Sequence, residues 1–240
     1  MNALVKNVKR DTLDFIKRFL QAGKAAVKPA ACLLAAALLL PGGPASAQST
    51  LPVATQSTLL VVGDSLSAEY GLRRGTGWVP LLEKQLATAQ KSVKVVNASI
   101  SGDTTSGGRS RLAGLIKQHR PTVVVIELGG NDALRGLPLD MTEKNLTAMV
   151  QASKKSGAKV LLLGMQVPPN YGGAYGATFA GLFSKVAKAE KVALVPFFLK
   201  GIADAEDATG QFQADRIHPN EQAQAKMLAN VQPELMKLIP

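Results

Sequence analysis

Short apolar segments alternate with helical patterns from about residue 57 onward, and this alternation limits the possible folds more than any other feature. Thr122–Leu128 is nearly pure apolar, as expected for a parallel strand buried on both faces. The expected strands are Thr58–Val62, Val93–Asn97, Thr122–Leu128, Lys159–Gly164 and Val192–Val195. The expected helices are Trp78–Ala89, Thr105–His119, Thr142–Ser156, Thr178–Lys191 and Pro219 to about Leu238.

This order predicts an α/β fold, a three-layer α/β/α sandwich with a five-stranded parallel sheet in one domain. Two helices carry start signals. Thr142, followed by Asn145, is expected to begin one of them, and Gly157 to end it. Pro219 is expected at the first position of the last helix, where its missing N–H is not needed.

The first 47 residues are expected to be a secretory signal. A basic region leads into an apolar run from Ala30 to Leu40, and Ala45-Ser46-Ala47 forms a small–x–small cleavage site. The run is shorter than the roughly 20 residues that a bilayer-spanning helix needs. We expect cleavage after Ala47, a polar lead over 48–56, a domain over 57–240, and a periplasmic or secreted product. The alternatives are an uncleaved membrane anchor and a start codon downstream of Met1.

Charge and cysteine content exclude several function classes. The chain has 28 Lys and Arg against 17 Asp and Glu; residues 1–47 hold seven and two of these, which leaves 21 against 15. The remaining basic residues are scattered, which argues against nucleic-acid binding. The only cysteine, Cys32, lies inside the signal, where lipidation is a weak alternative. The mature chain would then lack disulfides and cysteine–zinc sites, and its two histidines argue against any dedicated zinc site.

Polar and glycine residues cluster where the expected strands end. In open parallel sheets, reactive groups gather outside the carboxyl ends of the strands, so these clusters should share one rim. The four clusters are Gly63–Ser67, Ser99–Asp103, Gly129–Asp132 and Asp215–Pro219.

His218 is the candidate base on this rim. Asp215 lies three residues earlier, so its carboxylate can reach Nδ1 and leave Nε2 free to accept a proton. His119 ends a helix at the opposite rim, where a cation near a helix C-terminus is the simpler interpretation. Ser65 is the candidate nucleophile, whereas Ser67 should point elsewhere if the turn is helical. Alone, each motif also fits a plain turn or a helix cap.

Acyl transfer also needs donors aimed at a developing oxyanion. The backbone N–H groups of Ser65 and Gly102 and the side-chain amide of Asn131 would supply three. Gly102 and Asn131 also fit ordinary turns. The chain has no G-x-S-x-G elbow, which excludes the α/β-hydrolase arrangement.

The four clusters together resemble the SGNH (GDSL) hydrolase family over essentially all of residues 57–238. Further stretches resemble its bacterial periplasmic thioesterase, lysophospholipase and arylesterase subgroup: Leu128–Arg135, Pro169–Gly172 and Val195–Phe198. The resemblance implies a flavodoxin-like SGNH fold, a triad of Ser65, Asp215 and His218, and an oxyanion hole of Ser65, Gly102 and Asn131.

The resemblance also implies an acyl groove that includes the loop after the fourth strand. That loop contributes Val167, Pro168, Asn170 and Tyr171. The family commonly has a larger aliphatic residue where this chain has Val167, which leaves the chain-length preference open. Ordinary loop packing is the alternative for Val167 and Tyr171.

The expected function is hydrolysis of fatty acyl esters and thioesters through an acyl-serine intermediate, without a metal or organic cofactor. The expected partner is a small acyl ester, thioester or lysophospholipid. We expect no nucleic acid, no stable membrane insertion after signal cleavage, and a monomer by default. A carbohydrate O-acetylesterase of the same family is the second hypothesis. A small-ligand or phosphate-binding module on the same fold is the third, and it would leave Asp215 and His218 without a role.

Overall fold

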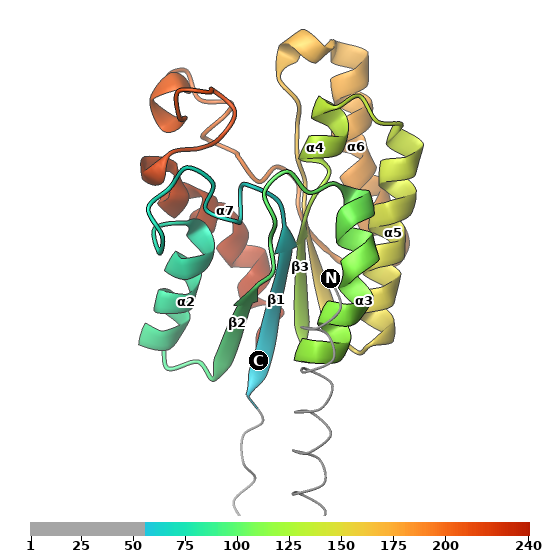
Figure 1. The fold of residues 1–240 in the computed structure, drawn as a ribbon, viewed down its shortest axis with the longest axis vertical. Helices are drawn as coiled ribbons and strands as arrows, with labels where there is room; N and C mark the ends of the chain where they lie inside the picture. Colours follow the sequence, from blue (N-terminus) through green and yellow to red (C-terminus); the bar gives the residue numbers. More distant parts are fainter. Residues whose placement is uncertain (1–55) are drawn as a thin grey trace, which may run out of the picture. The chain divides into compact units, whose positions relative to one another are not determined.

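The computed structural model describes residues 56–240 (Figure 1). Their buried hydrophobic side chains form one core. The expected signal sequence and nearly all of the polar lead lie outside the described residues. The five strands are parallel, as predicted, and their order in the sheet is β2-β1-β3-β4-β5. Their bounds are β1 Ser57–Gly63, β2 Val93–Asn97, β3 Val123–Glu127, β4 Lys159–Leu163 and β5 Ala193–Val195.

Helices cover both faces of the sheet, which confirms the predicted three layers (Figure 1). One layer holds α3 Thr105–His119, α5 Leu139–Lys155 and α6 Gly173–Glu190, which pack side by side. The other holds α2 Trp78–Thr88 and α7 Gln224–Met236, which pack on each other. Because helices cover the sheet on both sides, β3 is buried at every position.

Three expected helix starts are wrong. Helix α6 begins at Gly173 and not at Thr178. In the other two cases a tertiary contact uses the residue expected at the start. Helix α5 begins at Leu139, and Thr142 is fully buried with its hydroxyl 3.3 Å from an Asp132 carboxylate oxygen. Pro219 forms an isolated bridge with Phe212 instead of opening a helix. The side chain of Asn220 caps the 3-10 helix η3 (Glu221–Ala223), and α7 follows it.

The carboxyl ends of the strands meet at one edge of the sheet, where the short helix α4 (Gly130–Leu134) follows β3. Sequence patterns did not predict α4, because its five residues are too few for a periodicity. Within residues 56–240, no helix combines the length and apolar character that crossing a membrane requires.

Candidate active site

Ser65, His218 and Asp215 form a chain of side-chain contacts at this edge. The Ser65 Oγ lies 2.9 Å from His218 Nε2, and His218 Nδ1 lies 2.6 Å from Asp215 Oδ2. Ser65 comes from the turn after β1, and the other two come from the segment before η3. The structure therefore brings together a hydroxyl and an imidazole that are 153 positions apart in the sequence.

A short turn fixes the positions of Asp215 and His218. Asp215 Oδ1 accepts hydrogen bonds from the backbone N–H groups of Ile217 (2.9 Å) and His218 (3.0 Å). These bonds, that from His218 foremost, lower the pKa of Asp215 to about 2. The carboxylate is therefore ionised at neutral pH while its second oxygen contacts the imidazole. The ring of Tyr70 packs against the His218 imidazole, with the ring centroids 4.4 Å apart.

The turn after β1 separates Ser65 from Ser67. The Asp64 carbonyl accepts hydrogen bonds from the N–H groups of Ser67 (3.3 Å) and Ala68 (2.9 Å), so the chain turns helically there. Ser67 is almost fully buried; its hydroxyl donates to Glu127 Oε2 (2.8 Å) and accepts from Trp78 Nε1 (3.1 Å). Ser67 points away from the imidazole, as predicted.

Each of the three predicted oxyanion donors keeps an N–H group without an acceptor in the described part of the chain. Among residues 56–240, the backbone N–H groups of Ser65 and Gly102 donate to no acceptor. The Ile100 N–H donates to the Gly63 carbonyl (3.0 Å), which ties the loop that carries Gly102 to the end of β1. Asn131 donates one side-chain N–H to Asp64 Oδ2 (3.0 Å), which leaves its second N–H for another partner.

A buried carboxyl pair lies beneath the Ser65 turn, and sequence reasoning missed one of its members. Glu127 ends β3 fully buried; its Oε2 accepts from the Asp64 N–H (3.2 Å) as well as from Ser67, and its Oε1 has no partner in the described chain. Burial, followed by the charge of Asp64, raises the pKa of Glu127 well above its usual range. Burial raises the pKa of Asp64 to about 6. An acidic residue closing an apolar strand was the available signal.

Position 63 must be a glycine, because no side chain fits above the buried carboxyl pair. A Cβ at position 63 would lie 2.7 Å from Glu127 Oε2 and 2.9 Å from the Ser67 side chain, closer than such atoms approach. The first residue of the Gly63–Asp64–Ser65 motif therefore reflects the packing of Glu127 and Ser67 under the turn.

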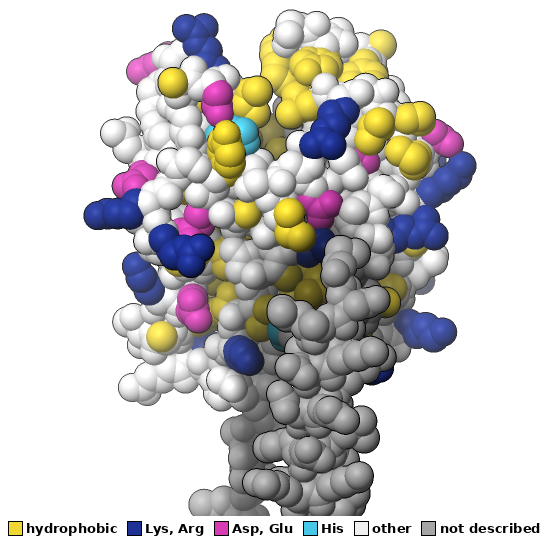
Figure 2. All heavy atoms as spheres, in the orientation of Figure 1, with side chains coloured by type: hydrophobic (Ala, Val, Ile, Leu, Met, Phe, Trp, Pro, Cys, Tyr) yellow, Lys and Arg dark blue, Asp and Glu magenta, His cyan; other side chains and the backbone are white. Residues whose placement is uncertain are grey.

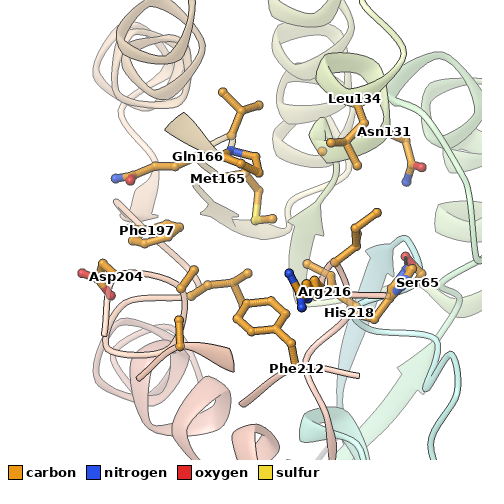
Figure 3. Close-up of a pocket in the computed structure, with 18 of the residues that line it drawn as sticks. Ser65, Asn131, Leu134, Met165, Gln166, Phe197, Asp204, Phe212, Arg216 and His218 are labelled. Atoms are coloured by element: carbon orange, nitrogen blue, oxygen red, sulfur yellow. Dashed lines mark hydrogen bonds between the residues drawn. The ribbon is translucent and has the colours of Figure 1, made fainter. Parts of the chain in front are cut away.

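A pocket of about 610 Å³ opens beside Ser65 and His218 (Figure 3). Most of its lining side chains are apolar, and Figure 2 shows hydrophobic side chains gathered around the hollow at the upper edge of the described domain. Lining residues that the sequence did not predict include Leu134, Met165, Phe197, Phe212 and Arg216. Leu134 comes from helix α4 and the others from loops after β4 and β5, whose side-chain directions no local pattern reveals.

The four groove residues implied by resemblance divide into two pairs. Val167 and Pro168 line the pocket. Asn170 and Tyr171 do not; both are exposed in the 3-10 helix η1 (Pro169–Tyr171), of which Pro169 alone lines the pocket. Tyr171 instead stacks on Tyr175, with ring centroids 6.4 Å apart.

Metal ligation finds no support in the described part of the chain. No group of three or more His, Cys, Asp or Glu side chains in residues 56–240 is arranged to hold a metal ion. His119 ends α3 at the opposite edge of the sheet, as predicted, and lines no part of the pocket.

Residues 61–226 match the GDSL-like lipase/acylhydrolase family. The chain belongs to this family. It is 51% identical to esterase TesA of Pseudomonas aeruginosa over 85% of this chain and 99% of that protein. It is 42% identical to thioesterase 1/protease 1/lysophospholipase L1 of Escherichia coli over 73% of this chain and 81% of that protein.

A solved GDSL-type relative shares the described fold. The psychrotrophic esterase EstA from Pseudoalteromonas sp., in a structure inhibited by monoethylphosphonate, superposes with a TM-score of 0.71 at 39% identity. The match covers 75% of this chain and 97% of that one. The chain is therefore a carboxylic ester hydrolase with a GDSL fold, and its substrates are small-molecule esters.

Proposed function

We propose that Ser65 is the nucleophile of this esterase, His218 its general base, and Asp215 the group that orients the imidazole. The continuous contact from Ser65 Oγ through His218 to Asp215 carries this proposal. A serine hydroxyl becomes an effective nucleophile only when a neighbouring base accepts its proton. The ionised Asp215 would fix the tautomer that leaves Nε2 free and stabilise the imidazolium that forms.

In the first step of this mechanism, His218 takes the Ser65 proton while the serine oxygen attacks the acyl carbonyl. The oxyanion receives hydrogen bonds from the N–H groups of Ser65 and Gly102 and from the Asn131 amide. The tetrahedral intermediate then expels the alcohol or thiol, which takes the proton from His218. Water, deprotonated by His218, attacks the acyl-serine and releases the free acid. Two backbone donors without intramolecular acceptors among residues 56–240 support the assigned oxyanion hole.

We propose fatty acyl esters and thioesters as the substrate class, including aryl esters and lysophospholipids. The apolar pocket of about 610 Å³ next to Ser65 supports this, since an acetyl group would leave most of it unfilled. The relatives' names, esterase and thioesterase 1/lysophospholipase L1, agree with this class. Val167 and Pro168 are the loop residues that we assign to acyl-chain contact. A carbohydrate O-acetylesterase is the second candidate, which the pocket disfavours.

We further propose that the protein is exported, with residues 57–240 as the mature hydrolase domain. The basic region, short apolar run and small-residue site of residues 1–47 support a cleaved signal. Outside the cytoplasm, lysophospholipids and other esters are more accessible substrates than acyl-CoA. N-terminal sequencing of the product recovered from the periplasm or the medium tests this; a product that retains Met1 would contradict it.

Two measurements test the proposed chemistry. A fluorophosphonate probe should label Ser65, as identified by mass spectrometry of the labelled peptide, and should leave Ser67 unlabelled. Hydrolysis of p-nitrophenyl esters from acetyl to palmitoyl should be fastest for medium or long chains. Labelling at another residue would remove Ser65 from its assigned role. Faster turnover of acetylated sugars than of medium-chain esters would favour the O-acetylesterase.

A further inference from the structure

Arg216 is the one Lys or Arg among the described residues that line the pocket. Arg216 is an exposed residue. Its side chain lines the pocket and lies between Phe212 and His218 (Figure 3). A cation in a mostly apolar pocket that is proposed to hold an acyl chain needs an explanation of its own.

The backbone fixes where this cation sits. Arg216 has a φ of 58°, in the left-handed region that residues other than glycine, asparagine and aspartate seldom adopt. Its N–H donates to the Gln213 carbonyl (2.9 Å), and the Gln213 N–H donates to the His218 carbonyl (2.8 Å). The turn that positions His218 therefore also directs the Arg216 side chain.

The guanidinium has no partner within the described chain. It forms no ion pair and no side-chain hydrogen bond in residues 56–240. Asp215, its neighbour, already accepts from two backbone N–H groups and contacts the imidazole. Asp64 accepts from Leu66 and Asn131. Asp204 accepts from the Gly201 N–H (2.5 Å) and lies toward the far end of the pocket (Figure 3). The guanidinium donors of Arg216 thus remain available to a ligand.

We propose that Arg216 is a specificity-determining residue that binds a negatively charged group on the leaving alcohol of the ester. This inference rests on the proposed function, in which His218 delivers its proton to the leaving oxygen. Arg216 belongs to the same turn as His218 and is exposed, so we place the leaving alcohol on this side of the pocket. The apolar remainder of the pocket holds the acyl chain. A phosphate suits the site best, because the planar guanidinium binds two of its oxygens at once.

A matched substrate pair isolates this contact. Octanoyl-glycerol and octanoyl-glycerol-3-phosphate differ only in the phosphate on the leaving alcohol, and both are used below the concentration at which they aggregate. The measured quantity is the ratio of kcat/KM for the phosphate ester to that for the neutral ester. A third substrate, the mono-p-nitrophenyl ester of suberic acid, carries its charge on the acyl side and is compared with p-nitrophenyl octanoate.

Three variants of Arg216 change the charge in steps. Arg216→Asn removes the charge while keeping a residue that tolerates the left-handed conformation, Arg216→Glu reverses it, and Arg216→Lys retains it. The control is Arg120→Asn: Arg120 is also an exposed arginine with a positive φ (45°), but it caps α3 at the opposite edge of the sheet. The control separates a local contact from a change in net charge.

We expect Arg216→Asn to lower the phosphate-to-neutral ratio by about tenfold, as for the loss of one charge-assisted contact. We expect Arg216→Glu to lower it further, Arg216→Lys to lose about threefold, and Arg120→Asn to leave it unchanged. The wild-type ratio should also fall as salt rises from low to high concentration. The ratio of the acyl-side charged ester to its neutral counterpart should respond less than threefold.

Other results overturn the inference. Equal ratios in the wild type, Arg216→Asn and Arg216→Glu mean that Arg216 does not recognise charge. An equal fall in Arg120→Asn means that only net charge matters, and a larger effect on the suberic acid ester moves the contact to the acyl side. Failure of the proposed function itself has a separate sign, because Ser65→Ala would then still cleave the neutral esters.

Discussion

Ser65 and Ser67 lie two positions apart in the sequence, and their side chains point to opposite sides of one turn. Each hydroxyl belongs to a group of side chains that includes a carboxyl residue. Ser65 contacts His218 beside the pocket, and His218 in turn contacts Asp215; the His218 and Asp215 side chains are 19% and 37% exposed. Ser67 contacts Glu127 beneath the turn, where the two residues are 2% and 0% exposed. The residue types are similar, but one group is partly exposed and the other is buried.

The surroundings shift the carboxyl pKa values in opposite directions. Backbone N–H donors lower the pKa of Asp215, whereas burial raises the pKa of both Glu127 and Asp64. A carboxylate that stays ionised can stabilise an imidazolium, and a buried carboxyl that retains its proton serves as a hydrogen-bonding group. Asn131 joins the two regions, because its amide donates to Asp64 and lies on the pocket wall. Burial, more than residue type, therefore separates the candidate catalytic residues at the pocket from the supporting residues beneath the turn.

The largest expected contrast is between the two serines. Ser65→Ala should lower kcat for p-nitrophenyl octanoate by on the order of a millionfold, since it removes the nucleophile. Ser67→Ala should change kcat less than tenfold but lower the free energy of unfolding by about 1–3 kcal/mol, because the Trp78 and Glu127 groups lose their partner. Steady-state kinetics and urea denaturation of both variants check this. Equal losses of kcat would erase the distinction between the two regions.

The second contrast is between the carboxylate of Asp215 at the pocket and the buried carboxyl of Glu127. Asp215→Asn should lower kcat by about ten-thousandfold, because an amide favours the wrong tautomer of His218. In the wild type, a pKa of about 2 keeps Asp215 ionised and its contribution to folding intact above pH 4, with loss as the pH falls toward 2. Stopped-assay kinetics of the variant at pH 7 test the first statement. A drop smaller than tenfold would separate Asp215 from the chemistry.

A smaller effect is expected for the amide that links the regions. Asn131→Ala should lower kcat by about a hundredfold or more with little change in KM, since it removes a donor to the oxyanion while leaving the pocket wall in place. Asn131→Asp is the companion variant, because it keeps the size and removes the donor. Steady-state kinetics with p-nitrophenyl octanoate test this expectation. A change confined to KM would assign Asn131 to substrate binding alone.

The smallest expected effect is a change in how stability depends on pH. Because the native carboxyl pair holds its protons longer than the unfolded chain does, the wild-type free energy of unfolding should fall as pH rises from about 4 past 6. Glu127→Gln cannot ionise at this position, so its profile should be flatter over the same range. Glu83→Gln, on the exposed face of α2, is the control and should follow the wild type. Parallel profiles for the wild type and Glu127→Gln would show that Glu127 is not protonated in the native state.

Much of the site could be anticipated from strand ends. The four polar clusters follow strands whose carboxyl ends must share an edge, and Asp215 and His218 are close enough in sequence to form one turn. Two of the implied groove residues, Asn170 and Tyr171, lie outside the pocket lining, and Tyr171 stacks on Tyr175 instead. Arg216 was overlooked because its direction depends on a positive φ that the sequence does not reveal.

Residue patterns alone predict the layered α/β architecture and which loops share the reactive edge, because both follow from the periodicity of apolar residues and the polarity of parallel strands. The tertiary structure alone decided that Glu127 lies fully buried under the turn, that Thr142 and Pro219 start no helix, and that Arg216 enters the pocket. Each of these depends on neighbours far along the chain. Burial and side-chain direction arise from the packing of distant segments, which no local pattern encodes.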